Sequence, residues 1–435
     1  MPVRTPLVTA IAAGVLAVAA LGAAGTTSHA ATGDGGAPDR GGRTVEYFPD
    51  SHGPGRHVPA PASVPAEIGR VQQAPALAPG ATGVTALQRT GPADGRLDLV
   101  IVGDGYTADQ QGDFAQDAQA KLDAIFAIEP YKSYRGLFNF WLVNAVSNQS
   151  GVSGDPTADV VKSTAVSSYF FCSDTERLLC VDEKKVDAYA QQAPASDIVF
   201  VIANSTKYGG AGYSGLSSTA GHTGIATMSS DNDRSYLIGA HELGHSIGLL
   251  ADEYQYDGYG TYPGAEPAEP NTSKQTAAEM GSTRSKWYRW LGQSDPAGGT
   301  VGTYEGAGYY EYGIYRPTQN SIMRALDTDV FNLPGREAMI AGFYRAADLV
   351  TAAGPLRVDV APLAKGLADV RIRWYVDGVE VPGAAGRHSL QPASLRLRAG
   401  PHRVTATAVD HTRALRDPSA RRTTKTTLTW TLSRP

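Results

Sequence analysis

Two histidines and a glutamate stand at the spacing that a metal-dependent hydrolase uses. His241, Glu242 and His245 form the pattern His-Glu-x-x-His in this 435-residue chain. On a helix the two histidines lie roughly 40° apart around the axis and about 6 Å apart along it, so both imidazoles can reach one ion. The glutamate projects beside them, where its carboxylate can take a proton from water and pass it to a leaving amine. The pattern predicts zinc as the cofactor, with His241 and His245 as ligands and Glu242 as the catalytic base; the alternative is an exposed helix with chance histidines.

The residues around this motif predict the helix that presents it. Residues 197–202, Asp-Ile-Val-Phe-Val-Ile, have the continuous apolar character of a buried strand. A helix is expected to begin near Arg234 and to end just past the motif, because Gly248 is a helix stop signal.

A catalytic zinc needs a third protein ligand, and the residues after the motif limit the choice. In a continued helix Asp252 would lie roughly 10 Å beyond the second histidine along the axis, too far for a bond of about 2 Å. We therefore expect a turn at Gly248, since glycine adopts positive φ without steric cost. The turn would return Asp252 and Glu253 to the metal, and Asp252 is the predicted ligand because it comes first. The pair could instead be an N-cap or a solvated turn, and without a helix break Glu305 or His222 would be the next candidates.

This stretch resembles the metzincin clan of zinc peptidases, whose pattern is His-Glu-x-x-His-x-x-Gly-x-x-His followed by a methionine turn. The third histidine of that pattern falls at Ala251, which cannot bind metal. The chain is more similar to the IgA-peptidase (igalysin-type) branch, in which a Leu-Ala-Asp-Glu-Tyr run follows the helix, here at residues 250–254. Further similar stretches lie at residues 103–107, 131–135, 144–151 and 315–324.

The resemblance implies a metzincin-like zincin fold and a role for Met323. Residues 321–323, Ser-Ile-Met, resemble the methionine turn, which would put Met323 beneath the metal as an apolar floor. In metzincins with a tyrosine that swings onto the metal, that tyrosine lies two residues after this Met, and here the position is Ala325. Candidates for a hydrogen bond to the oxyanion are instead the tyrosines that crowd the approach: Tyr309, Tyr310, Tyr312 and Tyr315.

The N-terminus has the features of a secretory signal peptide. Arg4 gives a positive start, residues 7–21 are apolar, and Ser28-His29-Ala30 is a small-x-small cleavage site. The mature protein is therefore expected to be secreted and extracellular, and no later apolar run predicts a membrane span. Outside the cell the two cysteines, Cys172 and Cys180, are expected to form one disulfide, with metal binding or free thiols as alternatives. The net charge of −5, without a basic stripe, argues against nucleic acid as a partner.

Composition divides the chain into four parts. Residues 1–30 are the signal peptide, and residues 31–95 are rich in Gly, Pro and Ala with one apolar patch at residues 45–48. That second part is expected to be loosely folded, either as a propeptide-like extension over the cleft or as a plain linker. Residues 96–352 alternate between strands and helices, which predicts an α+β catalytic domain with a mixed sheet and an active-site helix. Residues 353–435 alternate at strand period between turns, which predicts a small all-β sandwich that binds a partner or braces the enzyme.

These features predict a secreted zinc metalloendopeptidase that acts on extracellular proteins or peptides. The alternative is a secreted adhesion or binding protein whose zincin-like domain is not catalytic. Glu242 argues against that alternative, because a structural zinc needs no base and usually has a fourth protein ligand. A third hypothesis, an exopeptidase or amidase, requires an anchor for a free terminus, for which Arg316 and Arg324 are candidates. The sequence does not indicate an oligomeric state.

Overall fold

The centre of the computed structural model is an eight-stranded mixed sheet with the order β2-β1-β7-β8-β6-β4-β5-β3. The β4–β5, β4–β6 and β6–β8 pairs are parallel, and the remaining neighbours are antiparallel. In chain order the strands are β1 (Thr44–Tyr47), β2 (Arg56–Pro59), β3 (Val84–Gln88), β4 (Leu97–Asp104), β5 (Phe138–Val143), β6 (Ile198–Ala203), β7 (Gly210–Tyr213) and β8 (Ile225–Ser229).

The structure describes residues 43–70, 83–215, 218–395 and 397–434. The predicted signal peptide lies outside these residues. The longer helices are α2 (Gln111–Ile125), α4 (Glu183–Ala190), α5 (Tyr236–Gly248) and α7 (Leu333–Ala346). Shorter helical segments are α1 (Ala66–Gly69), α3 (Tyr131–Tyr134), α6 (Ala277–Thr283), α8 (Pro418–Thr423) and the 3-10 turns η1 (Ala93–Gly95), η2 (Ala108–Gln110), η3 (Arg135–Leu137), η4 (Tyr288–Trp290) and η5 (Pro392–Ser394). None of the described helices has the length and apolar character of a membrane span.

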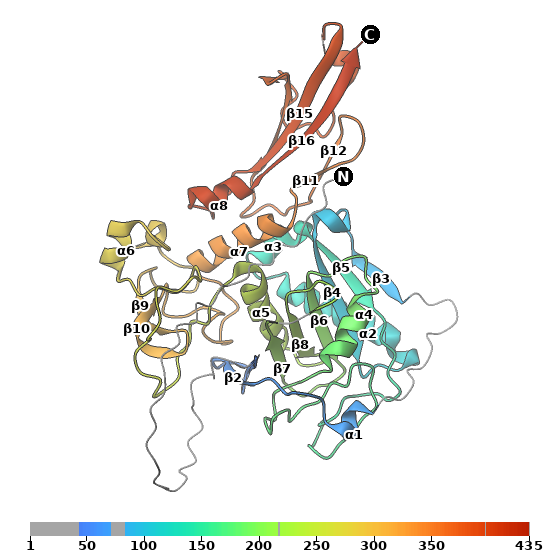
Figure 1. Cartoon of the computed structure of the whole chain (residues 1–435), viewed down its shortest axis with the longest axis vertical. Helices are drawn as coiled ribbons and strands as arrows, with labels where there is room; N and C mark the ends of the chain where they lie inside the picture. The colour runs from blue at the N-terminus through green and yellow to red at the C-terminus, as the bar shows by residue number, and fades with distance from the viewer. Residues whose placement is uncertain (1–42, 71–82, 216–217, 396, 435) are drawn as a thin grey trace, which may run out of the picture. The chain divides into compact units, whose positions relative to one another are not determined.

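Helices cover both faces of the sheet, which explains why its central strands are continuously apolar. In β4, Leu99 and Ile101 belong to the core that also contains apolar side chains of α2, α5 and α7. The alternate residues, Val100 and Val102, belong to a second core on the other face, which includes residues of α4. A strand buried on both faces needs apolar residues at every position, because successive side chains point to opposite sides. The α+β class with a mixed sheet is confirmed (Figure 1).

The active-site helix ends where the sequence predicts, but a different residue makes the turn. α5 begins at Tyr236 and ends at Gly248, and Leu249 adopts the left-handed conformation with φ of 54°. The expectation that Gly248 itself would take positive φ is therefore wrong. Gly248 is needed for space instead, since a Cβ there would lie 2.5 Å from the Met339 sulfur. Leu249 is 58% exposed, so its side chain does not oppose the turn by packing.

The Gly/Pro/Ala-rich N-terminal part contains an ordered hairpin. β1 pairs antiparallel with β2 and, on its other side, with β7, where Val45 faces Tyr213 and Glu46 faces Gly212. Val45 and Phe48 of the apolar patch are fully buried. The expectation of a loosely folded segment is thus wrong for residues 44–59. The apolar patch at residues 45–48 pairs with the free edge of β7 and buries its apolar side chains there.

After α7 the chain is mainly β-structure. β11 (Val350–Ala352) pairs with β12 (Val358–Val360), and a four-stranded antiparallel sheet follows, formed by β13 (Val370–Val376), β14 (Val379–Glu380), β15 (Gly400–Asp410) and β16 (Lys425–Arg434). Trp374 and Val404 of this sheet join the same core as Phe343 of α7. The described residues beyond Gly36 also form one compact unit. A separate sandwich domain starting at residue 353 therefore stays a prediction, and the short helix α8 interrupts the β-structure.

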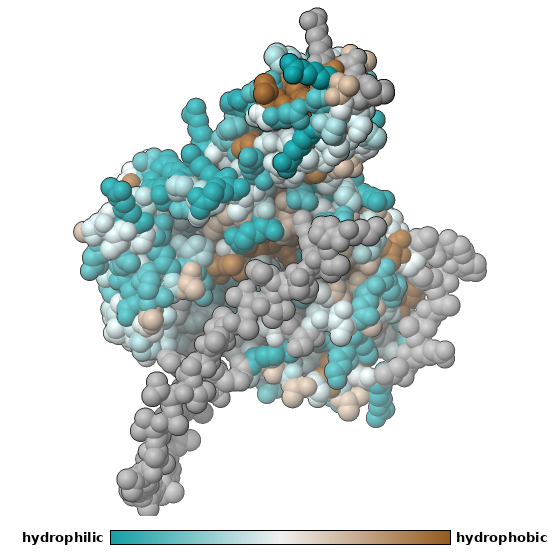
Figure 2. Space-filling view, turned by 45° about the horizontal axis from the view of Figure 1, so that its top comes forward, coloured by the Kyte–Doolittle hydropathy of each residue, from teal (hydrophilic) through white to brown (hydrophobic). Residues whose placement is uncertain are grey.

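The face drawn in Figure 2 is mostly hydrophilic, with small hydrophobic groups between charged and polar residues. The large hydrophobic side chains that are exposed among the described residues are Val161, Leu249, Tyr312 and Val379. They come from four segments that are far apart in the sequence.

Candidate metal centre

Helix α5 presents both histidines of the motif toward one point. Their Nε2 atoms lie 2.8 Å apart. The Nδ1 atom of His241 lies 2.9 Å from the Ile322 carbonyl oxygen, and that of His245 lies 2.7 Å from the Leu250 carbonyl oxygen. A carbonyl accepts a hydrogen bond only from a protonated Nδ1, so these contacts leave Nε2 of each ring as the lone pair that can bind metal.

The turn at Leu249 brings Asp252 to the same point. Its Oδ1 atom lies 3.2 Å from His241 Nε2 and 3.4 Å from His245 Nε2. Its Oδ2 atom accepts a 2.7 Å hydrogen bond from the Tyr309 hydroxyl. Asp252 Oδ1 is buried and has no hydrogen-bond partner, so one carboxylate oxygen is held in place while the other faces the histidines.

The neighbouring Glu253 faces away from the histidines. Its carboxylate accepts hydrogen bonds from Asn271 at 3.0 Å, from Ser321 at 2.7 Å and from Asn332 at 2.9 Å. Its backbone amide donates to the Met323 carbonyl at 2.8 Å. Glu253 therefore connects the chain after α5 to the methionine turn at residues 321–323. Of the two carboxylates, only that of Asp252 joins the cluster.

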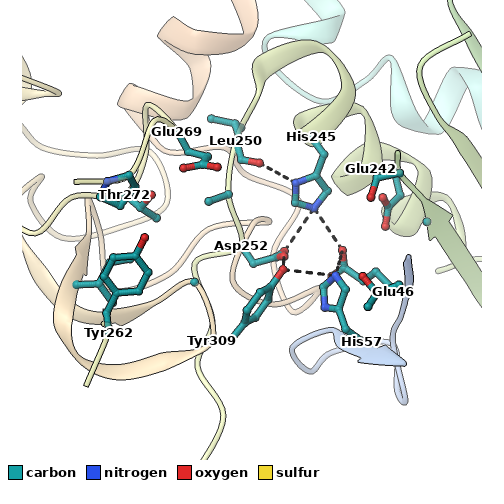
Figure 3. Close-up of a pocket in the computed structure, with 17 residues that line it drawn as sticks. Glu46, His57, Glu242, His245, Leu250, Asp252, Tyr262, Glu269, Thr272 and Tyr309 are labelled. Carbon is teal, nitrogen blue, oxygen red and sulfur yellow. Dashed lines mark hydrogen bonds and ion pairs between the residues drawn. The ribbon is translucent and has the colours of Figure 1, made fainter. Parts of the chain in front are cut away.

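A fourth ligand candidate, Glu46, comes from the N-terminal hairpin and escaped the sequence analysis. Its Oε1 atom lies 3.3 Å from His241 Nε2, and its Oε2 atom lies 3.3 Å from His245 Nε2. Oε1 also accepts a 2.7 Å hydrogen bond from the Tyr254 hydroxyl. Figure 3 shows Glu46, next to the blue hairpin, and Asp252 both turned toward His245. The signal in the sequence was a charged residue inside the apolar patch at residues 45–48.

The four side chains Glu46, His241, His245 and Asp252 fit a tetrahedral metal ion. One ligand atom from each lies within 4.8 Å of all the others. Zinc bonds of about 2.0–2.1 Å in a tetrahedron place neighbouring ligand atoms about 3.3–3.4 Å apart. The distances from the carboxylate oxygens to the histidine nitrogens, 3.2–3.4 Å, are close to that spacing, with Glu46 approaching each histidine through a different oxygen. The two histidine nitrogens, 2.8 Å apart, lie closer together than a tetrahedral site requires. Two nitrogens and two carboxylate oxygens are also a ligand set that zinc accepts.

Glu242 lies beside this cluster, over strand β7. A Cβ on Gly212 of β7 would lie 2.0 Å from the Glu242 carboxyl carbon, so only glycine leaves room for this side chain. Glu242 Oε1 is buried without a hydrogen-bond partner. Burial and the nearby carboxylate of Glu46 raise the pKa of Glu242 to about 8. Glu242 is thus positioned as a proton-transferring group next to the candidate ligands.

A comparison with protein families gives this arrangement its context. The model of a family described as IgA Peptidase M64 matches residues 85–298 and 293–343, which is more than half of the chain. The chain belongs to the IgA peptidase M64 family. A search of curated proteins found no match. The matched region of this M64 protein contains the motif helix and Asp252 but begins at β3, after Glu46.

The pocket of the M64 protein is a cavity of about 370 Å³ beside the cluster. Its lining includes Glu46, Glu242, His245, Asp252 and Tyr309, and Figure 3 shows Tyr262, Thr272 and Glu269 across from Glu46 and Glu242. Of the four candidate tyrosines, Tyr309 lines this pocket. The others do not: the Tyr310 ring packs against Tyr262, Tyr312 is 54% exposed, and the Tyr315 backbone pairs with Ser273.

The remaining candidate residues of the M64 protein pack or form hydrogen bonds outside the set of candidate metal ligands. Met323 packs beneath α5, since a Cβ on Gly244 would lie 2.6 Å from its sulfur. Arg316 donates to the carbonyls of Glu305 and Gly306, and Arg324 donates to the Gln319 carbonyl.

The two fallback ligands lie outside the cluster: His222 is 3.2 Å from Asp187, and Glu305 accepts from the Gly313 amide. The disulfide between Cys172 and Cys180 is confirmed.

Proposed function

We propose that this M64 protein is a secreted, zinc-dependent endopeptidase with a metzincin-like catalytic domain, which hydrolyses peptide bonds of extracellular proteins. The observation that carries the proposal is the convergence of His241, His245 and Asp252 on one point, with the Glu242 carboxylate next to them. Membership of a peptidase family supports the reaction class.

The chain's own groups supply positioning and proton transfer in this reaction. When bound, zinc is a Lewis acid that polarises the scissile carbonyl. His241, His245 and Asp252 hold it, and Glu242 takes a proton from the water that adds to the carbonyl carbon. As the carbon–nitrogen bond breaks, Glu242 delivers that proton to the amine nitrogen. The Tyr309 hydroxyl donates to Asp252 Oδ2 and so orients this ligand, and the Tyr254 hydroxyl donates to Glu46 Oε1.

The lining of the pocket argues against cleavage next to a free C-terminus. Among the described residues that line it, none is Lys or Arg, so no cation is placed to bind a terminal carboxylate. Arg316 and Arg324, the proposed anchors for such a terminus, instead bind the backbone carbonyls of Glu305 and Gln319. The disulfide supports secretion, since such bonds persist in oxidising compartments.

A non-catalytic binding protein is the second candidate, and Glu46 is the observation in its favour. Together with the two histidines and Asp252, Glu46 makes a complete set of four protein ligands, which is typical of structural zinc sites. A structural site, however, has no use for an unpaired buried carboxylate such as that of Glu242.

The test is the variant Glu242→Gln, with Glu67→Gln at an exposed position of α1 as the matched control. Both changes are made in the natural chain and in a Glu46→Gln protein, because Glu46 fills a ligand position. Glu242→Gln should retain about one zinc per chain and lower the cleavage rate of a protein substrate by on the order of a hundredfold or more. Zinc content is measured by elemental analysis, and cut positions by mass spectrometry. Loss of zinc in Glu242→Gln would contradict the role of Glu242 as a residue that does not bind the metal. Bound zinc without cleavage in both proteins that retain Glu242, the natural chain and Glu46→Gln, would favour the binding-protein alternative.

A further inference from the structure

The N-terminal hairpin, residues 44–59, runs along the edge of the sheet that borders the candidate metal centre. β1 pairs antiparallel with β7, and Glu46 faces Gly212, the residue over which Glu242 lies. An extended segment of the chain thus already occupies the strand edge next to the proton-transferring group. Any peptide that pairs with this edge of β7 must take the place of β1, since a strand edge accepts one partner.

The hairpin is built closely around the carboxylate that it inserts. Glu46 is 3% exposed although it is charged, and Tyr254 holds its Oε1 atom. A Cβ on Gly55, in the turn of the hairpin, would lie 2.2 Å from the same oxygen, so the turn closes directly over the carboxylate. The Phe48 ring packs edge-on against His241, with 5.0 Å between ring centroids. The hairpin therefore covers the histidines with an anion and an apolar ring.

Three other parts of the enzyme hold the turn of the hairpin by its backbone. The Tyr208 hydroxyl donates to the Asp50 carbonyl at 3.0 Å, and the Arg234 guanidinium donates to the Ser51 carbonyl at 3.1 Å. The Leu326 amide, after the methionine loop, donates to the Gly53 carbonyl at 3.1 Å. The hairpin is thus fastened on several sides of the site rather than resting on it at one point.

The hairpin also lies outside the region that the family model matches. That region starts at residue 85, in β3, and contains Glu242, both histidines and Asp252. β3 lies at the opposite edge of the sheet from β2 and β1. The hairpin can therefore leave β7 without removing an interior strand or any proposed catalytic group.

We propose that residues 44–59 are an internal inhibitor, in which Glu46 takes the ligand position that the substrate carbonyl and the attacking water require. This inference rests on the proposed function. The chain as synthesised is then a latent peptidase, and activity requires the hairpin to be displaced or cut away from β7.

The test measures access to the metal as well as activity, on full-length chains loaded with Co²⁺ as a spectroscopic substitute for zinc. Glu46→Gln removes the anionic ligand, and Gly55→Ala displaces it while keeping the glutamate. The controls are Glu67→Gln, and Gly112→Ala at an exposed helical position where a Cβ meets nothing within 4 Å. Acetohydroxamate, a small chelating ligand, is titrated into each protein and followed by the visible absorption of Co²⁺, and the cleavage rate of a protein substrate is measured in parallel.

The two hairpin variants should bind acetohydroxamate at concentrations on the order of tenfold lower than the natural chain, because the tethered competitor is gone. Their cleavage rates should rise by a similar factor, while both controls match the natural chain. Equal hydroxamate affinity in the natural chain and in Glu46→Gln would overturn the inhibitor role, as would a cleavage rate that falls in Glu46→Gln. Failure of every protein to bind one Co²⁺ would instead overturn the proposed metal centre, and the inhibitor role with it.

Discussion

Two adjacent carboxylates, Asp252 and Glu253, have different tasks at this site. Asp252 Oδ1 faces the histidine nitrogens, whereas Glu253 is surrounded by the donors Asn271, Ser321 and Asn332. Successive side chains of an extended segment point to opposite sides, so the turn at Leu249 decides which carboxylate reaches the histidines. Asp252 belongs to the candidate cluster, and its role as the third ligand stays a prediction.

The variants Asp252→Ala and Glu253→Ala should therefore differ in kind. Asp252→Ala removes a proposed ligand and should weaken zinc binding by orders of magnitude, with little change in the stability of the metal-free protein. Glu253→Ala leaves several buried donors without an acceptor and should lower the free energy of unfolding by about 3 kcal/mol or more. The folded fraction of that variant should still bind zinc, with a loss of no more than roughly 10- to 100-fold. Zinc affinity by chelator competition and thermal unfolding separate the two effects, and zinc loss confined to Glu253→Ala would shift the assignment by one residue.

At the scale of elements, the site depends on how closely helix α5 approaches strand β7. Gly212 has no side chain, and the Glu242 carboxylate uses that space. Gly244 and Gly248 similarly let α5 pack on the sulfur atoms of Met323 and Met339. The glycines thus fix the depth of the helix and the position of its proton-transferring group.

Gly212→Ala should impair catalysis without removing the metal. A Cβ at this position would overlap the carboxylate of Glu242 and push it from its place, so cleavage should fall by on the order of a hundredfold, comparable to the loss of one catalytic group. Zinc content should not change, because the three proposed ligands lie on other segments. Gly112→Ala, where a Cβ meets nothing within 4 Å, is the matched control and should leave the rate unchanged. A rate in Gly212→Ala equal to that of the control would show that Glu242 does not work from this position.

Strand β4 contains a buried acid that makes stability depend on pH. Asp98 is 1% exposed, accepts hydrogen bonds from Asn139 and Trp141, and has its pKa raised to about 6 by burial. Because the pKa is higher in the folded state than in the unfolded chain, the protein should lose stability as pH rises from about 4 to about 6, and stay at the lower level above that range. Asp98→Asn keeps an acceptor oxygen without the charge.

Unfolding of Asp98→Asn by denaturant should show higher stability than the natural chain at pH 8, by on the order of 1–3 kcal/mol, and a much smaller difference at pH 4. Asp109→Asn, at an exposed position, is the control. A gain for Asp98→Asn that is equal at both pH values would exclude ionisation of Asp98 as its cause.

At the scale of the whole molecule, Asp410 connects the C-terminal sheet to the helices next to the site. Its carboxylate on β15 accepts 2.8 Å hydrogen bonds from Tyr134 of α3 and Tyr344 of α7, and it also accepts from the Asp369 and Thr412 amides. The apolar core is continuous across the same junction. The C-terminal β-structure is therefore a support for the helices of the catalytic part.

Asp410→Ala should lower the free energy of unfolding by at least about 3 kcal/mol, since it leaves several buried donors unpaired. Asp369→Ala removes an exposed carboxylate that pairs with Arg371 and should change stability by no more than about 1 kcal/mol. A single cooperative unfolding transition that moves as a whole would establish the coupling. Two transitions, of which only one shifts, would show instead that residues 353–435 unfold as a separate domain.

The sequence predicted the α+β class, the helix of the motif, the disulfide and the M64 family, because each has a local signature. His-Glu-x-x-His, a short cysteine spacing and continuous apolar strands depend on neighbouring residues. Glu46 was missed since its task depends on pairing between β1 and β7, which lie more than 150 residues apart in the chain. The positive φ of Leu249 was missed as well, because glycine at position 248 is the stronger sequence signal for that conformation. The close packing of Gly248 against Met339, which explains the glycine, depends on a contact that the sequence does not show.

The pairing of β1 with β7 also affects how the protein behaves in concentrated solution. Without the hairpin, β7 would present unpaired amides and carbonyls to solvent, and such edges recruit strands from other molecules. The hairpin that blocks the site thus also prevents the protein from self-associating through β7 at high concentration. After the hairpin leaves, the edge of β7 can pair either with a substrate or with another copy of the enzyme. The activated form should therefore aggregate faster than its precursor.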